Sequence, residues 1–509
     1  MRSPATVRSA KHARSRVAAS GWLPAVVVAL AGVSALMATA GAYGLHRDEL
    51  YFVVAGQHPD WGYVDQPPLT PLLNAASAAV LGVSGAGIRA LPALAYAVIV
   101  LLTAGIAGEL GGTRRARGLA ALTIAVSGLL AAGHLNTTAT YDILGWTVVL
   151  LVVVRQLRGA PPWGWLVAGL AAGIALENKD LLPFLGLGLA VGVAVCRRWE
   201  VLRSPWVWAG IAVALALWMP NLAWQAAHGW PQLEMARVIG ARSGSHNRVL
   251  LLPMQLLVAG PLLFPVAVAG EWWLLRAKAA SAWRPVGVAY LVVLALLFVT
   301  GGKGYYAGGL LPTLVAAGGG VVDGWLGRGH VRLRAAGFSS AAVASAACSA
   351  LLLLPIIPAS VVATTPVAAL NSDVGSQIGW DRVAATVRGV IDGLSPADRN
   401  RAVILAGNYG EAAALELLGG DGLPPVYSGH NSYADWGPPP EDRTLTVFVD
   451  AWDEDVDWAA PWLGPCSRAA VVDVGMTKST SEEQGAKVWV CPRRPMPWDE
   501  AWPHLRHVS

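Results

Sequence analysis

Charged residues are scarce in this sequence. Asp, Glu, Lys and Arg make up 14% of its 509 residues, whereas a soluble protein contains about 25%. Cysteine is also rare, and four cysteines are too few for a disulfide scaffold or an iron–sulfur protein. Hydrophobic residues make up 55% of the chain. This composition excludes a disordered protein, argues against a purely soluble enzyme and predicts a multi-span membrane protein.

The hydrophobic residues are grouped into segments long enough to cross a bilayer. A membrane-spanning helix needs about 20 apolar residues, and eleven segments approach this length. The sequence therefore predicts a polytopic α-helical membrane protein with about eleven spans. The predicted spans lie near residues 21–42, 88–109, 118–134, 141–154, 163–178, 181–196, 205–223, 250–274, 286–301, 304–322 and 336–358.

Basic residues occupy every second gap between these segments. Cytoplasmic loops carry an excess of Lys and Arg, so these gaps and the basic tail of residues 1–20 are predicted to be cytoplasmic. The net charge of +5 then reflects membrane orientation, and we expect no nucleic-acid partner. An odd number of spans places the C-terminal part outside. The basic groups lie within residues 2–16, 114–117, 155–158, 197–203, 276–284 and 328–334.

The composition changes at about residue 359, where strand-like runs begin to alternate with helical ones. Residues 359–509 are therefore predicted to form an extracytoplasmic α/β domain, attached to a membrane domain of residues 21–358. Cys466 and Cys491 both fall in this domain. In an oxidising compartment they could pair, or they could remain free thiols. Buried strands are predicted at residues 401–406 and 444–449, and helices at 383–394 and 410–418.

The first outer loop, residues 43–87, is the most polar gap. Asp48 and Glu49 directly follow the first span, and Asp65 comes later in the same loop. Acids in lipid are costly, so we expect this pair to face a water-filled cavity. A carboxylate at the rim of such a cavity is suited to take a proton from a hydroxyl group. The alternative is a solvated loop that contains a few acids.

Residues 47–73 of this loop (RDELYFVVAGQHPDWGYVDQPPLTPLL) resemble the first periplasmic loop of a group of bacterial glycosyltransferases. This group is related to the protein O-mannosyltransferases of family 39 and includes the aminoarabinose transferase of lipid A. In its members an Asp-Glu-type motif follows the first span, and an aromatic-Asp-x-Pro-Pro segment comes after it. Here these motifs are Asp48-Glu49 and residues 63–68, with Gln66 where the family commonly has His.

The resemblance continues along most of the chain. Residues 136–142 (NTTATYD) are similar to the family's second acidic motif, with Tyr141 in place of the usual Thr. Residues 221–233 and 302–312 resemble its Asn-x-x-Trp-x-x-x-His-x-Trp-Pro loop and its Lys-x-x-Tyr-x-x-x-x-x-Pro segment. The tail is similar to a soluble domain that many bacterial members carry, in residues 407–411 (GNYGE) and 428–431 (SGHN).

The resemblance implies a GT-C fold and a glycosyltransferase. Such an enzyme would transfer a sugar from a polyprenyl-phosphate donor to an acceptor hydroxyl or amine at the outer face of the cytoplasmic membrane. The sugar would be mannose, arabinose, aminoarabinose or glucose, and the acceptor a protein, lipid or glycan. Asp48 is then the candidate general base. Glu49 assists it or binds the sugar, with a structural role as the alternative. The predicted substrate-binding residues are Tyr63, Asp65, Asp142, Lys179, His228, Lys303 and Tyr305.

Two features of this set remain open at the level of sequence. Lys303 is the better candidate to bind the phosphate, because neighbouring glycines leave the backbone open to an anion, whereas Lys179 could simply pair with the acids on either side of it. Asp65, Asp142 and His228 have the oxygen and imidazole ligands that suit a divalent cation. The sequence shows no tight ligand spacing, so the requirement for a metal stays open.

Two other functions are compatible with the composition. A transporter or flippase of lipid-linked sugars would line a pathway with acids and lysines at mid-membrane depth, yet the centres of the predicted spans are almost free of charge. The sequence also shows no internal repeat of the kind found in many transporters. A non-catalytic membrane scaffold for the C-terminal domain would leave the Asp48-Glu49 loop unexplained.

Overall fold

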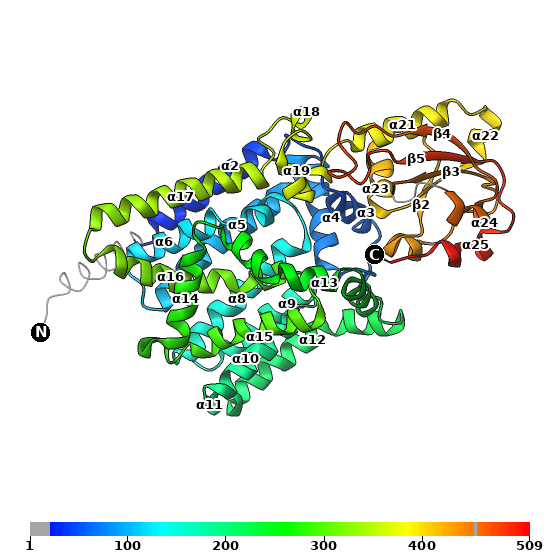
Figure 1. The fold of residues 1–509 in the computed structure, drawn as a ribbon. Helices are drawn as coiled ribbons and strands as arrows, with labels where there is room; N and C mark the ends of the chain where they lie inside the picture. The colour runs from blue at the N-terminus through cyan, green and yellow to red at the C-terminus, as the bar shows by residue number, and fades with distance from the viewer. Residues whose placement is uncertain (1–20, 452–455, 509) are drawn as a thin grey trace, which may run out of the picture.

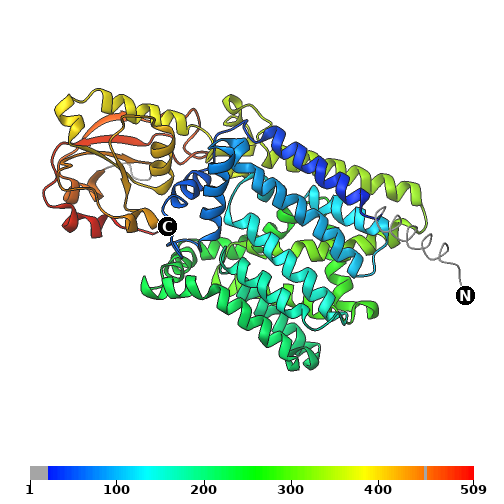
Figure 2. The same ribbon diagram turned by 180° about the vertical axis from the view of Figure 1, so that it is seen from behind.

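The computed structural model describes residues 21–451 and 456–508. A bundle of apolar helices is followed by a mixed α/β domain, which lies at one end of the bundle (Figure 1). Figure 2 shows the same arrangement from behind, with the blue helices α3 (Arg47–Ala55) and α4 (Leu69–Leu81) placed between the rest of the bundle and this domain. The predicted cytoplasmic tail, residues 1–20, lies outside the described residues.

Most helices of the bundle coincide with predicted apolar segments. The helices of the bundle are α2 (Leu23–Thr39), α5 (Gly85–Glu109), α6 (Arg114–Ala125), α7 (Leu130–His134), α8 (Thr138–Leu157), α9 (Gly164–Leu176), α10 (Leu182–Val195), α11 (Trp199–Arg203), α12 (Pro205–Ala227), α13 (Pro231–Ala259), α14 (Phe264–Arg276), α15 (Arg284–Thr300), the 3-10 helix η2 (Gly304–Leu310), α16 (Leu311–Leu326) and α17 (Val331–Leu353).

The helical membrane architecture is confirmed in part. Within the described residues, five helices are long and apolar enough to cross a membrane, and a sixth span results if the bent pair of α13 and α14 counts as one. Several other apolar helices, such as α9 and α10, are shorter than a full span. The predicted count of about eleven spans is therefore not confirmed.

Three predicted segments differ from the structure. The predicted span of residues 118–134 is divided into α6 and α7, with residues 126–129 between them. Residues 250–274 were expected to form one span, but α13 and α14 meet there at an angle of 105°. Gly260 separates them in a backbone conformation with φ +82°, which favours glycine. The outer loop of residues 43–87 is also not an open loop, because it folds into α3 (Arg47–Ala55) and the apolar helix α4 (Leu69–Leu81).

Small residues allow some helices of the bundle to touch backbone to backbone. A Cβ atom on Gly169 of α9 would clash with the carbonyl oxygen of Gly210 in α12. A Cβ atom on Gly270 of α14 would clash in the same way with the carbonyl oxygen of Leu314 in α16. Lipid offers little hydrophobic driving force for association, so such close backbone packing is a main source of attraction between helices in a membrane.

The predicted cytoplasmic gaps meet at the end of the bundle away from the α/β domain. Arg158 lies 3.6 Å from a carboxylate oxygen of Glu109, the last residue of α5. Arg115 pairs with Asp323 near the end of α16, with 2.5 Å between Nε and Oδ1. These ion pairs bring together the ends of α5, α8 and α16 and the start of α6, as expected if three of the basic gaps lie at one end of the bundle. Which end faces the cytoplasm stays a prediction.

The C-terminal part contains a five-stranded sheet with the order β2-β1-β3-β5-β4. The two strands predicted from sequence are its central pair, β1 and β3, which run parallel. The strand β2 is also parallel to β1, whereas β5 is antiparallel to its neighbours. The strands are β1 (Ala402–Ala406), β2 (Val426–Ser428), β3 (Leu445–Asp450), β4 (Ser467–Val471) and β5 (Lys487–Cys491).

Short helices precede, connect and flank these strands, and the first two of them, α18 (Ala359–Val362) and α19 (Pro366–Leu370), lie beside the bundle (Figure 1). The two predicted helices are present as α21 (Trp380–Asp392) and α23 (Tyr409–Leu418). The others are α18 (Ala359–Val362), α19 (Pro366–Leu370), α20 (Ser372–Gly375), α22 (Pro396–Asn400), η3 (Asn431–Trp436), η4 (Val456–Trp458), α24 (Ala460–Leu463) and α25 (Trp498–Leu505).

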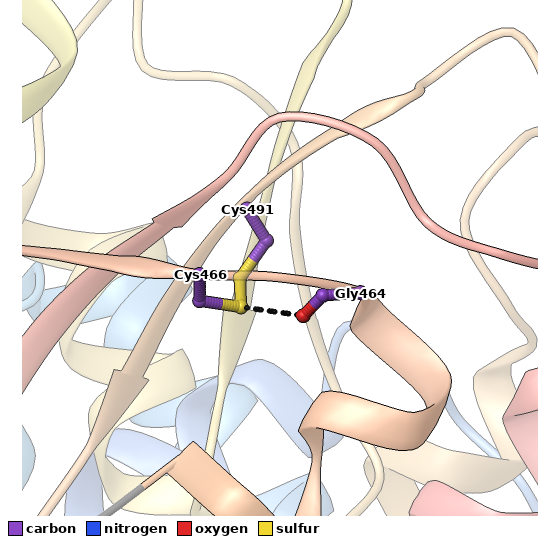
Figure 3. Close-up of a disulfide and its surroundings, with 3 residues drawn as sticks. All are labelled: Gly464, Cys466 and Cys491. Carbon is purple, nitrogen blue, oxygen red and sulfur yellow. Dashed lines mark hydrogen bonds between the residues drawn. A yellow bond between two sulfur atoms is a disulfide. The ribbon is translucent and has the colours of Figure 1, made fainter.

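Cys466 and Cys491 form a disulfide between the start of β4 and the end of β5 (Figure 3). Their pairing was one of the two alternatives that the sequence left open. The other two cysteines, Cys196 and Cys348, are free. Disulfides persist in oxidising compartments, so the bond agrees with an extracytoplasmic domain.

The α/β domain shares a hydrophobic cluster with the first outer loop. Buried residues of α3, such as Leu50 and Val54, belong to the same cluster as Val383 and Ala413 of the domain. Helices α3 and α23 pack directly against each other. The domain is therefore anchored on the most polar segment of the membrane part, next to the predicted catalytic residues.

Candidate active site

The first turn of α3 presents the two adjacent acids of the first outer loop. His46 precedes this helix and its ring accepts a hydrogen bond from the backbone N–H of Asp48. The side chain of Glu49 accepts a hydrogen bond from the backbone N–H of His46, at 2.8 Å. This reciprocal pattern is a capping box. It starts the helix and fixes the direction of both acids.

Glu49 is fully buried and forms an ion pair with Arg89 of α5, with 2.8 Å between Oε2 and Nη2. Its other carboxylate oxygen accepts a hydrogen bond from the backbone N–H of Asn136 at 2.9 Å. Both oxygens are therefore engaged in holding three segments together. The sequence suggested that Glu49 assists catalysis or binds the sugar, but its contacts in the structure are those of a structural residue.

Asp48 lies on the opposite side of the same turn and is one-third exposed. Its Oδ1 atom accepts a hydrogen bond of 2.9 Å from the hydroxyl of Tyr409, a residue of the α/β domain. Burial would raise the pKa of Asp48, but the charges of His46, Arg47 and Lys303 and the bond from Tyr409 lower it below its usual value. Asp48 is therefore ionised at neutral pH.

Asp65 has the opposite electrostatic environment. Burial raises its pKa to about 7, although a hydrogen bond of 2.9 Å from the hydroxyl of Tyr51 opposes this shift; the negative charge of Asp48 raises the pKa further. The rings of Tyr51 and Tyr409 are 4.8 Å apart. Two neighbouring carboxyl groups whose environments separate their pKa values are typical of acid–base sites.

Two lysines and a third acid complete the group. Asp142 of α8 is buried and accepts a hydrogen bond of 2.9 Å from the indole N–H of Trp146. Lys179, in the loop between α9 and α10, places its ammonium 4.4 Å from the ring centre of Tyr306. Burial lowers the pKa of Lys179 to about 8; the charge of Lys303 lowers it too, whereas Asp142 and Asp48 raise it. Asp48, Asp142, Lys179 and Lys303 therefore lie close enough to influence one another.

Tyr305 belongs to the same group, because its ring centre is 5.6 Å from the ammonium of Lys179. Tyr63 does not, since its ring is buried and its hydroxyl donates to the backbone oxygens of Ala55 and His58. His228 is exposed at the end of α12, where its Nδ1 atom lies 2.8 Å from the carbonyl oxygen of Trp224. The substrate-binding roles predicted for Tyr63 and His228 have no support from these contacts.

The suggested metal site is not assembled. Across the chain apart from residues 1–20, 452–455 and 509, no three His, Cys, Asp or Glu side chains are grouped so that they could hold a metal ion. Asp65 contacts Tyr51 and Asp142 contacts Trp146, while the ring of His228 stacks on Trp224. The three suggested ligands therefore serve other contacts.

Sequence reasoning missed two residues of this region. Arg89 was not singled out, although an arginine beside a long apolar run is itself a sign of a buried partner. Tyr409 was noted only as part of residues 407–411 (GNYGE), which resemble a soluble domain. Its contact with Asp48 joins residues 361 positions apart, and no local pattern predicts such a pair.

Comparison with known proteins agrees with this architecture. Residues 65–224 match the family model described as dolichyl-phosphate-mannose-protein mannosyltransferase. The structure of ArnT from Cupriavidus metallidurans bound to undecaprenyl phosphate superposes with a TM-score of 0.57 at 15% identity. The match covers 93% of this chain and 98% of ArnT. The chain has the GT-C fold.

The resemblance to the GT-C glycosyltransferases expected from the sequence is thereby confirmed, and with it a multi-pass membrane protein. ArnT in its apo state matches equally well, with a TM-score of 0.57 at 14% identity over 93% of this chain and 98% of that one. The oligosaccharyltransferase AglB from Archaeoglobus fulgidus is more distant, at 12% identity and a TM-score of 0.49 over 86% of this chain and 70% of that one. No curated protein matches the sequence.

The buried pair of Glu49 and Arg89 leads to a prediction on stability. Glu49→Gln leaves the guanidinium of Arg89 buried without a countercharge, which costs about 3–5 kcal/mol of unfolding free energy. Glu200→Gln is the matched control, because Glu200 pairs with Arg198 at an exposed site and should cost about 1 kcal/mol or less. Thermal unfolding of the purified variants would measure both. Equal stability of the two variants would contradict the structural role of Glu49.

Proposed function

We propose that this chain is an integral-membrane glycosyltransferase. In this proposal it transfers a sugar from a polyprenyl-phosphate donor to an acceptor hydroxyl or amine at the outer face of the cytoplasmic membrane. The observation that carries the proposal is the grouping of the ionised carboxylate of Asp48 with Lys179 and Lys303. A base and two cations in one site match the two needs of sugar transfer, which are to activate an acceptor and to stabilise a leaving phosphate.

The donor class is supported by the fold. ArnT, which shares this fold over nearly its whole length, was crystallised with undecaprenyl phosphate. Nucleotide sugars are not available outside the cytoplasm, so a lipid-linked sugar is the donor that fits an outer site. The transfer assay below identifies the sugar and the acceptor class, whether lipid, glycan or protein.

The proposed reaction is a single displacement. Asp48 takes the proton from the acceptor hydroxyl, and the resulting oxygen attacks the anomeric carbon of the sugar. The bond from this carbon to the phosphate oxygen breaks, with inversion at the anomeric centre. The polyprenyl phosphate leaves, and Lys303 and Lys179 stabilise its charge. Asp142 orients Lys179 by its charge, and Asp65 orients the sugar or the acceptor.

The proposed orientation places the N-terminus in the cytoplasm and the α/β domain outside. The arginine-rich gaps meet at the end of the bundle away from this domain, as cytoplasmic loops would. The disulfide lies in the domain at the opposite end. Under this orientation Asp48, Lys179 and Lys303 face the compartment in which lipid-linked sugars are consumed.

Transfer from a panel of radiolabelled polyprenyl-phosphate sugars into membrane extracts tests the function. The wild-type chain should transfer at least one sugar, whereas Asp48→Asn should lower turnover by about 10²–10⁴-fold, as expected for a general base. Donor binding, measured separately with the same lipids, should persist in Asp48→Asn. Equal transfer by both proteins would contradict the role of Asp48. Movement of the donor across a bilayer without transfer would favour the transporter instead.

The separated pKa values of the two acids predict the shape of the pH profile. The pKa of Asp48 is lowered in the folded protein, so this carboxylate stays ionised until the pH falls below about 4, the ordinary range of aspartate. If Asp48 is the base, the acid limb of kcat/KM lies there. Asp65 instead gains a proton as the pH falls through about 7. An acid limb near pH 7 that Asp65→Asn abolishes would assign the proton transfer to Asp65.

Lys303 provides the test of the phosphate site. A charge pair at about 4 Å is worth roughly 4 kcal/mol at an effective dielectric of about 20, before desolvation is subtracted. After desolvation we expect a loss of about 1–3 kcal/mol, or about ten- to a hundredfold in turnover, for Lys303→Ala. Lys303→Arg should retain part of the rate, because the charge remains.

Two further variants complete this experiment. Lys179→Ala should cost less than Lys303→Ala, because Asp142 and the rings of Tyr305 and Tyr306 already stabilise that ammonium. Lys278→Ala, at an exposed site of the 3-10 helix η1 (Lys278–Ala280), removes the same charge from a residue outside the proposed site and should be silent. If Lys303→Ala and Lys179→Ala also left the turnover unchanged, the phosphate would have to bind elsewhere.

A further inference from the structure

The α/β domain contacts the first outer loop through side chains on both sides of the proposed base. Arg47, next to Asp48, forms an ion pair with Glu482 of the domain, with 2.6 Å between Nη1 and Oε2. The backbone N–H of Val64, next to Asp65, donates a hydrogen bond of 2.9 Å to the hydroxyl of Ser432. The domain therefore contacts the loop at the residues next to Asp48 and next to Asp65.

Tyr409 is the residue of the domain that bonds directly to Asp48. It is the first residue of α23, whose start is fixed by a capping box between Asn408 and Glu411. The backbone N–H of Tyr409 also donates to the Nδ1 atom of His430 at 3.2 Å. The centre of its ring lies 4.8 Å from the ring centre of Tyr51 and 5.8 Å from the guanidinium carbon of Arg47. Both the backbone and the ring are therefore held in place before any substrate arrives.

The hydroxyl of Tyr409 meets only one of the two oxygens of the base. It donates to Oδ1 of Asp48 at 2.9 Å, and the Nε atom of Arg47 lies 3.9 Å from the same oxygen. The Oδ2 atom lies 3.9 Å from the Nδ1 atom of His46, which is too long for a hydrogen bond. A carboxylate that is bound through one oxygen keeps a fixed rotamer and offers the other oxygen to a partner. Correct orientation of a base is worth a large share of its catalytic effect.

We propose that Tyr409 is a positioning residue for Asp48, so that the C-terminal α/β domain completes the active site of the membrane domain. Tyr409 holds Oδ1 and thereby directs Oδ2 towards the acceptor hydroxyl. This inference rests on the proposed function, because it assigns Tyr409 a role in that same proton transfer. It gives residues 407–411 (GNYGE), which contain Tyr409, a role at the membrane site.

The hydrogen bond also has a signature in the pH profile. Tyr409 is one of several groups that lower the pKa of Asp48, together with the charges of His46, Arg47 and Lys303, while burial raises it. Removal of the hydroxyl therefore raises the pKa of Asp48 and moves the acid limb of kcat/KM to higher pH. The titratable and charged groups around Asp48 are His46, Arg47, Asp65, Lys179, Lys303, Tyr305 and Tyr409.

Tyr409→Phe in the full-length protein tests the inference with the sugar donor found active for the wild type. We expect kcat to fall about ten- to a hundredfold with little change in the donor KM, and the acid limb to move to higher pH. Tyr427→Phe is the matched control, since it removes a hydroxyl from β2 of the same domain and should leave both quantities unchanged. Glu482→Gln removes the ion pair with Arg47 while leaving the hydroxyl of Tyr409 in place. Its kcat should therefore fall less than that of Tyr409→Phe.

The outcomes separate the two proposals. Wild-type transfer together with normal kcat and an unmoved acid limb in Tyr409→Phe would overturn the role of Tyr409 and leave the proposed function standing. A lower kcat with an unmoved limb would also overturn it, because a structural defect suffices for that result. In an Asp48→Asn background, Tyr409→Phe should have no further effect, and an additive loss would contradict the inference even if the single variant were less stable. Absence of transfer by the wild type with every donor would overturn both proposals.

Discussion

The buried ion pair between Glu49 and Arg89 is the contact on which the arrangement of the site depends. Arg89 also donates to the carbonyl oxygens of Ala40 and Gly44, at 2.7 and 2.9 Å, and to the side chain of Gln377 at 3.0 Å. The pair thus joins the end of α2, the start of α3, the body of α5 and the segment that leads into the α/β domain. Its desolvation cost is met only because so many partners surround it.

This anchoring explains how two adjacent acids acquire different roles. Successive residues of a helix point in directions about 100° apart, so the capping box that turns Glu49 into the protein turns Asp48 outwards. Glu49 fixes the position of the first turn of α3, and Asp48 carries the carboxylate that is proposed to react. The α/β domain then covers Asp48 from the other side through Tyr409. Neither the membrane part nor the domain alone contains the whole environment of this carboxylate.

The sequence predicted the parts of this structure that depend on local patterns. Apolar segments and alternating basic gaps gave the helices and their two ends, and the runs at residues 401–406 and 444–449 gave the two central strands. The contacts of Glu49 with Arg89 and of Asp48 with Tyr409 join residues 40 and 361 positions apart, and composition carries no information on such pairs. His228 matched a motif, yet its ring is held by its own helical turn at Trp224.

The electrostatics of the two lysines connect this geometry to catalysis. Lys303 lowers the pKa of Lys179, which means that the two ammonium groups repel each other in the resting protein. That repulsion is relieved when negative charge appears between them. In the proposed reaction the charge on the phosphate oxygen grows as its bond to the sugar breaks, so the relief is greatest in the transition state. Interactions that strengthen only at that point raise kcat, and a pair of preorganised cations near an ionised base is an arrangement that provides them.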